Sequence, residues 1–268
     1  MPENVDIYDG VYRNCDRDVY RQVRIDTYGE DLGQTGWTVV EESNQIPRLL
    51  ALRAGSSVLE IGCGCGAYAV CLAQQVGCRV IGLDINAEGI RHGKELAATR
   101  HVTATVQFDQ CDVARGLVFA SETFDAVFSN DALCHIPARD SVLREMFRVL
   151  KPDGRMLFSD ALVVGGMLSH YEIAMRSSLG YYVLSPPGEN ERLIKAAGFR
   201  QLEIIETTGN AARVASLWYQ ARQRRKQELL AIEGEASFDA LQHFLKCVHT
   251  LTSEERLLRR VYVAHKPG

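Results

Sequence analysis

Three glycines at alternate positions follow an apolar run, which is typical of a loop that binds a ligand. The run covers residues 57–61, and Gly62, Gly64 and Gly66 come directly after it. Glycine lets the chain turn sharply at the end of a strand and lets the backbone approach a ligand closely. The spacing Gly-x-Gly-x-Gly differs from the Gly-x-Gly-x-x-Gly of dinucleotide-binding enzymes, which disfavours an NAD-dependent oxidoreductase.

Two acidic residues stand where the next two expected strands end. Asp84 closes a strand expected at 79–84, and Asp112 follows a strand expected at 103–108. A carboxylate at the first place can accept hydrogen bonds from both hydroxyls of a ribose. At the second place, a carboxylate can accept from an adenine amino group, while the backbone N–H of Val113 meets a ring nitrogen. The two acids together predict a nucleoside-binding site.

Alternating strands and helices must position these residues. Apolar runs and helical spacing predict strands at 57–61, 79–84, 103–108, 124–129 and 155–159 and helices at 68–76, 87–99 and 141–150. Beyond them we expect a helix near 189–197, strands near 201–206 and 258–264, and one long helix at 211–230. This order predicts an α/β fold, a doubly wound, Rossmann-like, mostly parallel seven-stranded sheet with helices on both faces.

Four segments divide the chain. Residues 1–50 are polar and rich in tyrosine and predict an N-terminal helical lid, and residues 51–160 are the predicted cofactor-binding core. Residues 161–188 follow the fifth strand, where such sheets bind ligands, and predict a substrate lid. Residues 189–268 are expected to complete the sheet and add a helical cap. The basic run at 222–226 is interpreted as a solvated helix face.

Composition excludes several classes of function. The net charge of −4 offers no basic surface to a nucleic acid. No apolar stretch approaches the roughly 20 residues of a membrane helix. The first residues lack the features of a signal peptide, so we expect a cytoplasmic protein. We expect it to be a monomer or a homodimer. The eight cysteines are interpreted as reduced thiols, and Cys63-x-Cys65 lacks the second pair of a zinc site, so no metal is expected.

These motifs resemble the class I S-adenosylmethionine-dependent methyltransferases. The resemblance covers roughly residues 45–206 and implies that the protein binds S-adenosylmethionine and releases S-adenosylhomocysteine. It rests on Leu59-Glu60-Ile61-Gly62-Cys63-Gly64, on Asp84 and Asp112, on Phe124-Asp125-Ala126-Val127 and on Leu150-Lys151-Pro152-Asp153-Gly154.

The resemblance also implies a role for individual residues. Glu60 would lie near the methionine amino group through the glycine turn, and Asn130 close to the methionine part. Asp84 would bind the ribose, and Asp112 with Val113 the adenine. The full predicted cofactor set is Trp37, Glu60, Gly62, Cys63, Gly64, Gly66, Asp84, Ile85, Asp112, Val113 and Asn130.

Three short segments are similar to small-molecule N-methyltransferases of the phosphoethanolamine and sarcosine-dimethylglycine type. Residues 28–37 look like the segment that covers the cofactor in those enzymes. Residues 131–137 place His135 where the phosphoethanolamine enzymes have an active-site histidine, and residues 259–264 are similar to their last strand. A departure is Cys65, where a small polar residue is usual.

His135 is the predicted catalytic base. An amine must lose a proton to act as a nucleophile, and histidine suits that role. A histidine that only orders its loop is the alternative. The phosphoethanolamine enzymes pair this histidine with an N-terminal tyrosine, for which Tyr20 is the nearest match by position and Tyr12 the second choice. The two lids supply the tyrosines expected near the site, namely Tyr8, Tyr12, Tyr20, Tyr28, Tyr171, Tyr181 and Tyr182.

The predicted acceptor is a small molecule that is methylated at an amine nitrogen. Arg176, Arg213 and Arg259 are candidate partners for an anionic group on it. The apolar stretch at 161–168 keeps open an O- or C-methyltransferase of a natural-product pathway. A protein that binds the cofactor without catalysis is a further alternative, and the complete set of glycines and acids disfavours it.

Overall fold

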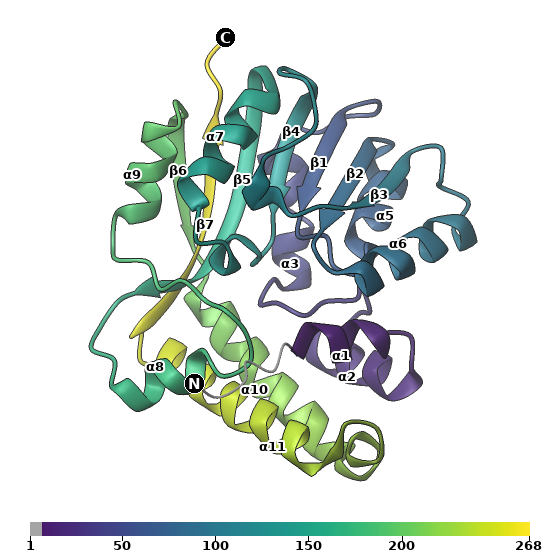
Figure 1. The fold of residues 1–268 in the computed structure, drawn as a ribbon, viewed down its shortest axis with the longest axis vertical. Helices are drawn as coiled ribbons and strands as arrows, with labels where there is room; N and C mark the ends of the chain where they lie inside the picture. The colour runs from purple at the N-terminus through teal and green to yellow at the C-terminus, as the bar shows by residue number, and fades with distance from the viewer. Residues whose placement is uncertain (1–6) are drawn as a thin grey trace.

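Seven strands form one sheet in residues 7–268, the part of the chain that the computed structural model describes. The order is β3-β2-β1-β4-β5-β7-β6, and β7 alone runs in the direction opposite to the other strands (Figure 1). The predicted fold class is therefore confirmed. The strands are β1 (Ser57–Ile61), β2 (Arg79–Asp84), β3 (Val106–Gln110), β4 (Phe124–Ser129), β5 (Leu150–Val164), β6 (Arg200–Glu206) and β7 (Leu257–His265).

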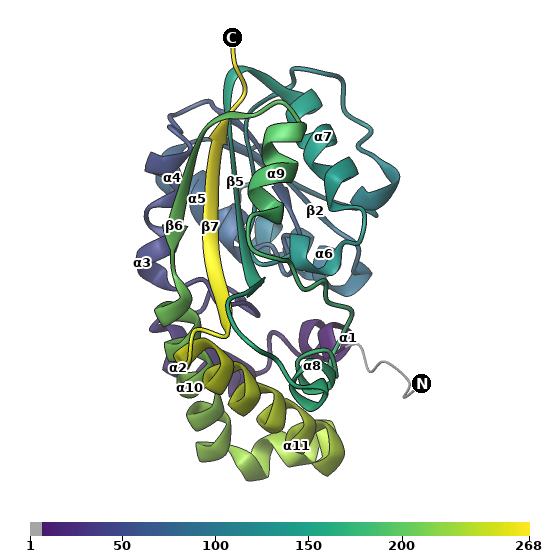
Figure 2. The same ribbon diagram turned by 90° about the vertical axis from the view of Figure 1, so that its left-hand side faces the viewer.

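Helices cover both faces of the sheet (Figure 2). Val58 joins the apolar layer under α4, α5 and α6, and its neighbour Leu59 joins the layer under α7 and α9. Successive side chains of a strand point to opposite faces, so a strand buried on both sides is apolar throughout. These helices are α4 (Ile46–Leu49), α5 (Ala67–Val76), α6 (Ala87–Thr99), α7 (Arg139–Val149) and α9 (Glu189–Ala196).

Two strands differ from their predicted ranges. β3 begins at Val106 rather than at residue 103, because the carbonyl of Val102 accepts hydrogen bonds from two following N–H groups and turns the chain. β5 begins at Leu150, bends at Asp153, where φ is 61°, and continues to Val164. Residues 161–164 of the expected insertion are thus part of the sheet, and Val164 pairs with Leu257 of β7.

The predicted helix at 211–230 is wrong in extent. Two helices occupy the region, α10 (Thr208–Arg224) and α11 (Lys226–Ser253), and they pack side by side (Figure 1). The basic run at 222–226 is only partly the solvated face that was predicted, because Arg224 and Lys226 are exposed but Arg222 is buried and contacts Glu233 at 2.6 Å. Arg225 contacts Asp26 of α2 (Asp18–Tyr28) at 2.6 Å, which ties α2 to the end of α10.

Short helices complete this end of the molecule. They are α1 (Ile7–Arg13), α3 (Val40–Ser43) and α8 (His170–Arg176). We refer to α1, α2, α8, α10 and α11 as the helical cap. α8 begins with a capping box, in which Ser169 and Glu172 each accept a hydrogen bond from the other's backbone N–H. Within residues 7–268, no helix combines the length and the apolar character that crossing a membrane requires.

Candidate active site

A cavity of about 600 Å³ lies between the carboxyl ends of the strands and the helical cap. Ile61, Leu83 and Val113 belong to its sheet side, and Trp218, Leu241 and Phe244 to its cap side. Open α/β sheets bind ligands at this edge. Of the predicted site residues, the cavity wall contains Trp37, Gly62, Asp84, Ile85, Asp112, Val113, Asn130 and His135.

The glycine turn after β1 has no room for side chains. A Cβ atom on Gly62 would lie 2.2 Å from the Cβ of Ala132, and one on Gly66 would lie 2.4 Å from the ring of Phe108. Both glycines also have positive φ angles, of 74° and 75°. Gly66 is the residue before α5 and is not on the cavity wall, so it acts by letting the turn pack against β3.

Asp84 holds the turn against the end of β2. Its carboxylate accepts hydrogen bonds from the backbone N–H of Gly64 at 2.8 Å and of Asn86 at 2.9 Å. The side chain is buried and lines the cavity. A carboxylate fixed in this way presents its remaining lone pairs to a ligand without a large reorganisation.

Glu60 is a buried acid whose Oε2 atom has no hydrogen-bond partner among the described residues. It lines a smaller cavity of about 90 Å³ together with Cys63 and Gly64, and Asn130 belongs to the walls of both cavities. Burial raises the pKa of Glu60 well above the usual range of a carboxyl group, and the nearby charge of Asp84 raises it further. An unpartnered buried carboxyl group is costly alone and suits a cationic ligand.

Asp112 and Val113 lie side by side on the cavity wall where the chain leaves β3. Asp112 caps a single 3₁₀ turn (Val113–Arg115) by accepting a hydrogen bond from the N–H of Ala114 at 3.1 Å. Its carboxylate also contacts Arg115 at 3.0 Å. Ile85 is largely exposed at the rim and so leaves an apolar surface open to a ligand.

His135 lies on the loop after β4 and is held by both ring nitrogens. Nδ1 is 2.8 Å from the carbonyl oxygen of Tyr181, and Nε2 is 3.0 Å from the hydroxyl of Tyr8 in α1. A carbonyl only accepts, so Nδ1 carries the proton and Nε2 is the acceptor. Burial and the neighbouring Tyr182 raise the pKa of Tyr8, which therefore stays protonated and donates to Nε2.

Tyr20 does not approach His135. Its hydroxyl donates to Glu233 of α11 at 3.4 Å, and Tyr20 is absent from the walls of both cavities. Burial raises the pKa of Tyr20 to about 12. Tyr8 occupies the place beside the histidine that the sequence analysis assigned to Tyr20. Tyr8 and Tyr12 are four residues apart on α1, and this helical spacing puts both on the cavity side.

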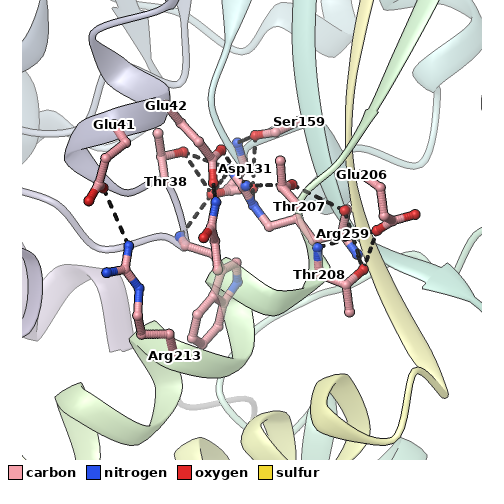
Figure 3. A network of polar contacts seen from close by, with 12 residues as sticks. Thr38, Glu41, Glu42, Asp131, Ser159, Glu206, Thr207, Thr208, Arg213 and Arg259 are labelled. Carbon is pink, nitrogen blue, oxygen red and sulfur yellow. Dashed lines mark hydrogen bonds and ion pairs between the residues drawn. The ribbon is translucent and has the colours of Figure 1, made fainter.

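Asp131, a residue of the cavity wall, forms a buried ion pair with Arg259, which Figure 3 shows from close by. Arg259 Nε is 2.9 Å from Asp131 Oδ1, and its Nη1 is 2.6 Å from Glu42 Oε2. Asp131 also accepts the backbone N–H of Trp37 at 2.8 Å. Burial raises the pKa of Asp131, but Arg259 and the hydrogen bonds from the Trp37 N–H and Ser159 together lower it more, so that it lies below the usual value. The network fixes Trp37 over the cavity.

The three arginines that are candidate partners for an anionic group of the acceptor differ in their contacts. Arg213 is half-exposed and contacts Glu41, and Arg259 is neutralised by Asp131 and Glu42. Only Arg176 among the three lines the cavity, at the end of α8. The charge pattern of the sequence did not distinguish them, because their partners come from distant segments.

The cysteines form no disulfide in the structure, and the side chains that the structure describes include no group arranged to hold a metal ion. Cys63 and Cys65 are both buried in the glycine turn. Burial raises the pKa of Cys63, so its thiol stays protonated.

Comparison with known proteins agrees with this geometry. Residues 52–179 match a family described as a methyltransferase domain, and they include the glycine turn, Asp84, Asp112 and His135. This chain contains a methyltransferase domain. The match ends at residue 179, so the helices α10 and α11 lie outside it.

Three relatives are methyltransferases, and the two whose names give a substrate differ in it. Methyltransferase GfsG of Streptomyces halstedii is 31% identical over 67% of this chain and 64% of its own length. Phosphoethanolamine N-methyltransferase of Triticum aestivum is 26% identical over 79% of this chain and 41% of its own length. The 27-O-demethylrifamycin SV methyltransferase of Amycolatopsis mediterranei is 28% identical over 81% and 84%. The chain thus spans less than two thirds of the first two relatives.

A solved structure shares the fold over nearly the whole chain. Phosphoethanolamine N-methyltransferase 2 of Haemonchus contortus, in complex with phosphomonomethylethanolamine and S-adenosylhomocysteine, aligns with a TM-score of 0.82 at 23% identity. The alignment covers 98% of this chain and 61% of that chain. The cap helices α10 and α11 therefore belong to an architecture that other methyltransferases have, although the family match does not include them.

Proposed function

We propose that the protein transfers a methyl group from S-adenosylmethionine to an amine nitrogen of a small molecule, with His135 as the base. The observation that carries the proposal is His135 itself, held at the cavity between the Tyr181 carbonyl and the Tyr8 hydroxyl. Because Nδ1 donates its proton in a hydrogen bond to the Tyr181 carbonyl, the ring can accept a further proton at Nε2.

The predicted cofactor residues fit S-adenosylmethionine. The unpartnered Oε2 of Glu60 suits the ammonium group of the methionine part, and Asp84 suits the ribose. Asp112 and Val113 would hold the adenine. Bound S-adenosylmethionine supplies an electrophilic methyl group on a sulfonium, so the protein has to orient the acceptor, exclude water and accept one proton.

The residues around His135 serve those tasks. The ring of Tyr182 lies 4.6 Å from the ring of His135, and Tyr8 stands edge-on to His135 at 5.3 Å. The proton that the acceptor loses passes to the Tyr8 oxygen as the Tyr8 proton passes to Nε2. The aromatic faces also stabilise the positive charge that a methylated amine carries.

An oxygen acceptor is the second candidate, with carbon as its variant in natural-product methylation. The apolar wall that Trp218, Leu241 and Phe244 form favours a larger acceptor than a simple amine. The relationship to the 27-O-demethylrifamycin SV enzyme points the same way.

The test is S-adenosylhomocysteine release with a panel of amines, amino acids, phenols and carboxylic acids. We expect turnover on an amine, and we expect His135→Ala to lower it by about 10²–10⁴-fold, since a general base contributes that much. The affinity for S-adenosylhomocysteine should stay within about two-fold in the variant, because His135 is on the acceptor side of the cavity.

His243→Ala is the matched control, because His243 is exposed on α11. Turnover confined to hydroxyl compounds would replace nitrogen by oxygen in the proposal. Equal turnover by the wild type and His135→Ala at all pH values would remove the base role.

A further inference from the structure

Arg176 is a buried cation on the wall of the cavity. It ends α8, where the capping box of Ser169 and Glu172 and the ion pair of Glu172 with Arg256 at 2.7 Å fix the helix. The side chain is 1% exposed, and its Nε and Nη1 atoms have no hydrogen-bond partner among the described residues. A buried guanidinium with unused donors is costly unless a ligand completes it.

The surroundings of Arg176 are aromatic rather than acidic. Its guanidinium carbon lies 4.4 Å from the ring centre of Tyr182, 4.9 Å from that of Phe244 and 5.9 Å from that of Trp37. Among the side chains that the structure describes, no carboxylate forms an ion pair with Arg176. Aromatic faces attract a cation but do not use its N–H groups. A side-chain hydrogen bond between Arg176 and the Tyr182 hydroxyl acts to lower the pKa of Tyr182, although burial raises it more, and Nε and Nη1 of Arg176 are still left without a partner among the described residues.

Other buried arginines of the chain have carboxylate partners. Arg222 is the closest comparison, because it also lies over a ring, that of Phe238 at 5.0 Å, yet it contacts Glu233 at 2.6 Å. The remaining pairs are Arg24–Asp31, Arg139–Asp160 and Arg259–Asp131. Arg176 is therefore the exception in the described part of the chain, and it is the one of these arginines that lines the 600 Å³ cavity.

We propose that Arg176 binds an anionic group, a carboxylate or a phosphate, on a methyl acceptor whose remaining body is apolar. This inference rests on the proposed function. Trp218, Leu241 and Phe244 provide the apolar wall beside the guanidinium. The ring centre of Tyr182 is 4.4 Å from the guanidinium carbon of Arg176 and 4.6 Å from the ring centre of His135. An anionic group bound at Arg176 is therefore separate from the acceptor atom at His135 that receives the methyl group.

The test measures binding of matched acids and neutral analogues to protein saturated with S-adenosylhomocysteine. Both tryptophans of the chain, Trp37 and Trp218, line the cavity, so their fluorescence reports on occupancy. The probes are 3-phenylpropionate, phenethyl phosphate and the neutral 3-phenylpropionamide. We expect at least one acid to bind about ten-fold or more tightly than the amide, and the stronger of the two identifies the anionic group.

Arg176→Met should remove the preference for the acid and leave the affinity for the amide unchanged. Arg176→Lys should keep part of the preference, and Arg213→Met, which removes an exposed charge outside the cavity, should keep all of it. The melting temperature of Arg176→Met should not fall, since the variant loses no ion pair.

Three results would overturn the inference. The first is equal affinity of the wild type for acid and amide, and the second is no binding of either acid with S-adenosylhomocysteine bound. The third is an equal loss of affinity for all probes in Arg176→Met together with a lower melting temperature. Calorimetry with S-adenosylhomocysteine on the same samples separates the two proposals, because absent binding there contradicts the proposed function instead.

Discussion

Individual residues of the site differ in what their surroundings allow them to do. Asp84 has backbone donors and keeps its place without a ligand, whereas Glu60 is buried with an unpartnered oxygen. The raised pKa of Glu60 means that its carboxyl group holds a proton over part of the pH range in which a free glutamate has lost it. A cationic ligand reverses this balance, because it favours the carboxylate.

Binding of S-adenosylhomocysteine should therefore release a proton from Glu60. Affinity should rise with pH above the usual range of a glutamate and become constant once the carboxyl group is already ionised in the free protein. Calorimetry in two buffers with different ionisation enthalpies measures the proton. Glu60→Gln should bind without release, and Glu235→Gln, at an exposed position of α11, should behave like the wild type. Equal proton release in both variants would assign it to another group.

Ion pairs, in addition to apolar contacts, hold separate elements of the fold together at the site. Arg259 comes from β7, Asp131 from the loop after β4 and Glu42 from α3 (Figure 3). One guanidinium faces two carboxylates, and hydrogen bonds from the Trp37 N–H and from the Thr38 and Ser159 hydroxyls help to stabilise the remaining negative charge on Asp131. The ion pairs hold the segment with Trp37 against the carboxyl edge of the sheet.

Arg259→Met should lower the free energy of unfolding by about 3–5 kcal/mol, because it leaves the carboxylates of Asp131 and of the partly buried Glu42 without a cation. Urea unfolding followed by circular dichroism measures the change. Arg213→Met removes a half-exposed partner of Glu41 and should cost about 0–1 kcal/mol. A similar small loss in both variants would mean that the network contributes little to stability.

The whole molecule surrounds its ligand from two sides. The sheet supplies the glycine turn and the acids, and the cap supplies Tyr8, Arg176 and Phe244 to the same cavity. A ligand that contacts both sides opposes every opening motion that separates them. The cap therefore lines the same cavity as the sheet, and we expect it to contact the ligand.

Saturating S-adenosylhomocysteine, at about 100 times its dissociation constant, should slow amide exchange up to about 100-fold where opening releases the ligand. We expect this protection at residues 60–66, 84–86 and 112–114 and also at 35–37, which cover the cavity from the N-terminal segment. The edge strand β6 is the internal control and should not change. Protection that stops at the sheet residues would show that the N-terminal segment does not close over the cofactor.

The sequence by itself determined the sheet and the edge of it at which we expect the nucleoside to bind. β1, β2, β4 and α6 match their predicted ranges, because apolar periodicity and glycine turns are local signals. The edge residues Gly62, Asp84 and Asp112 follow from the same signals, since they come directly after strands. The extents of β3, β5 and the helices after residue 207 were not predictable in this way, because tertiary hydrogen bonds and packing decide them.

Only the tertiary structure decided which side chains complete the site. Tyr8 reaches His135 across 127 residues of sequence, and Arg259 reaches Asp131 across 128. Local patterns carry no information on such pairs, so Tyr20 matched by position and yet contacts Glu233. The same holds for Arg176, whose charge is evident in the sequence but whose lack of a carboxylate partner depends on how distant aromatic residues pack around it.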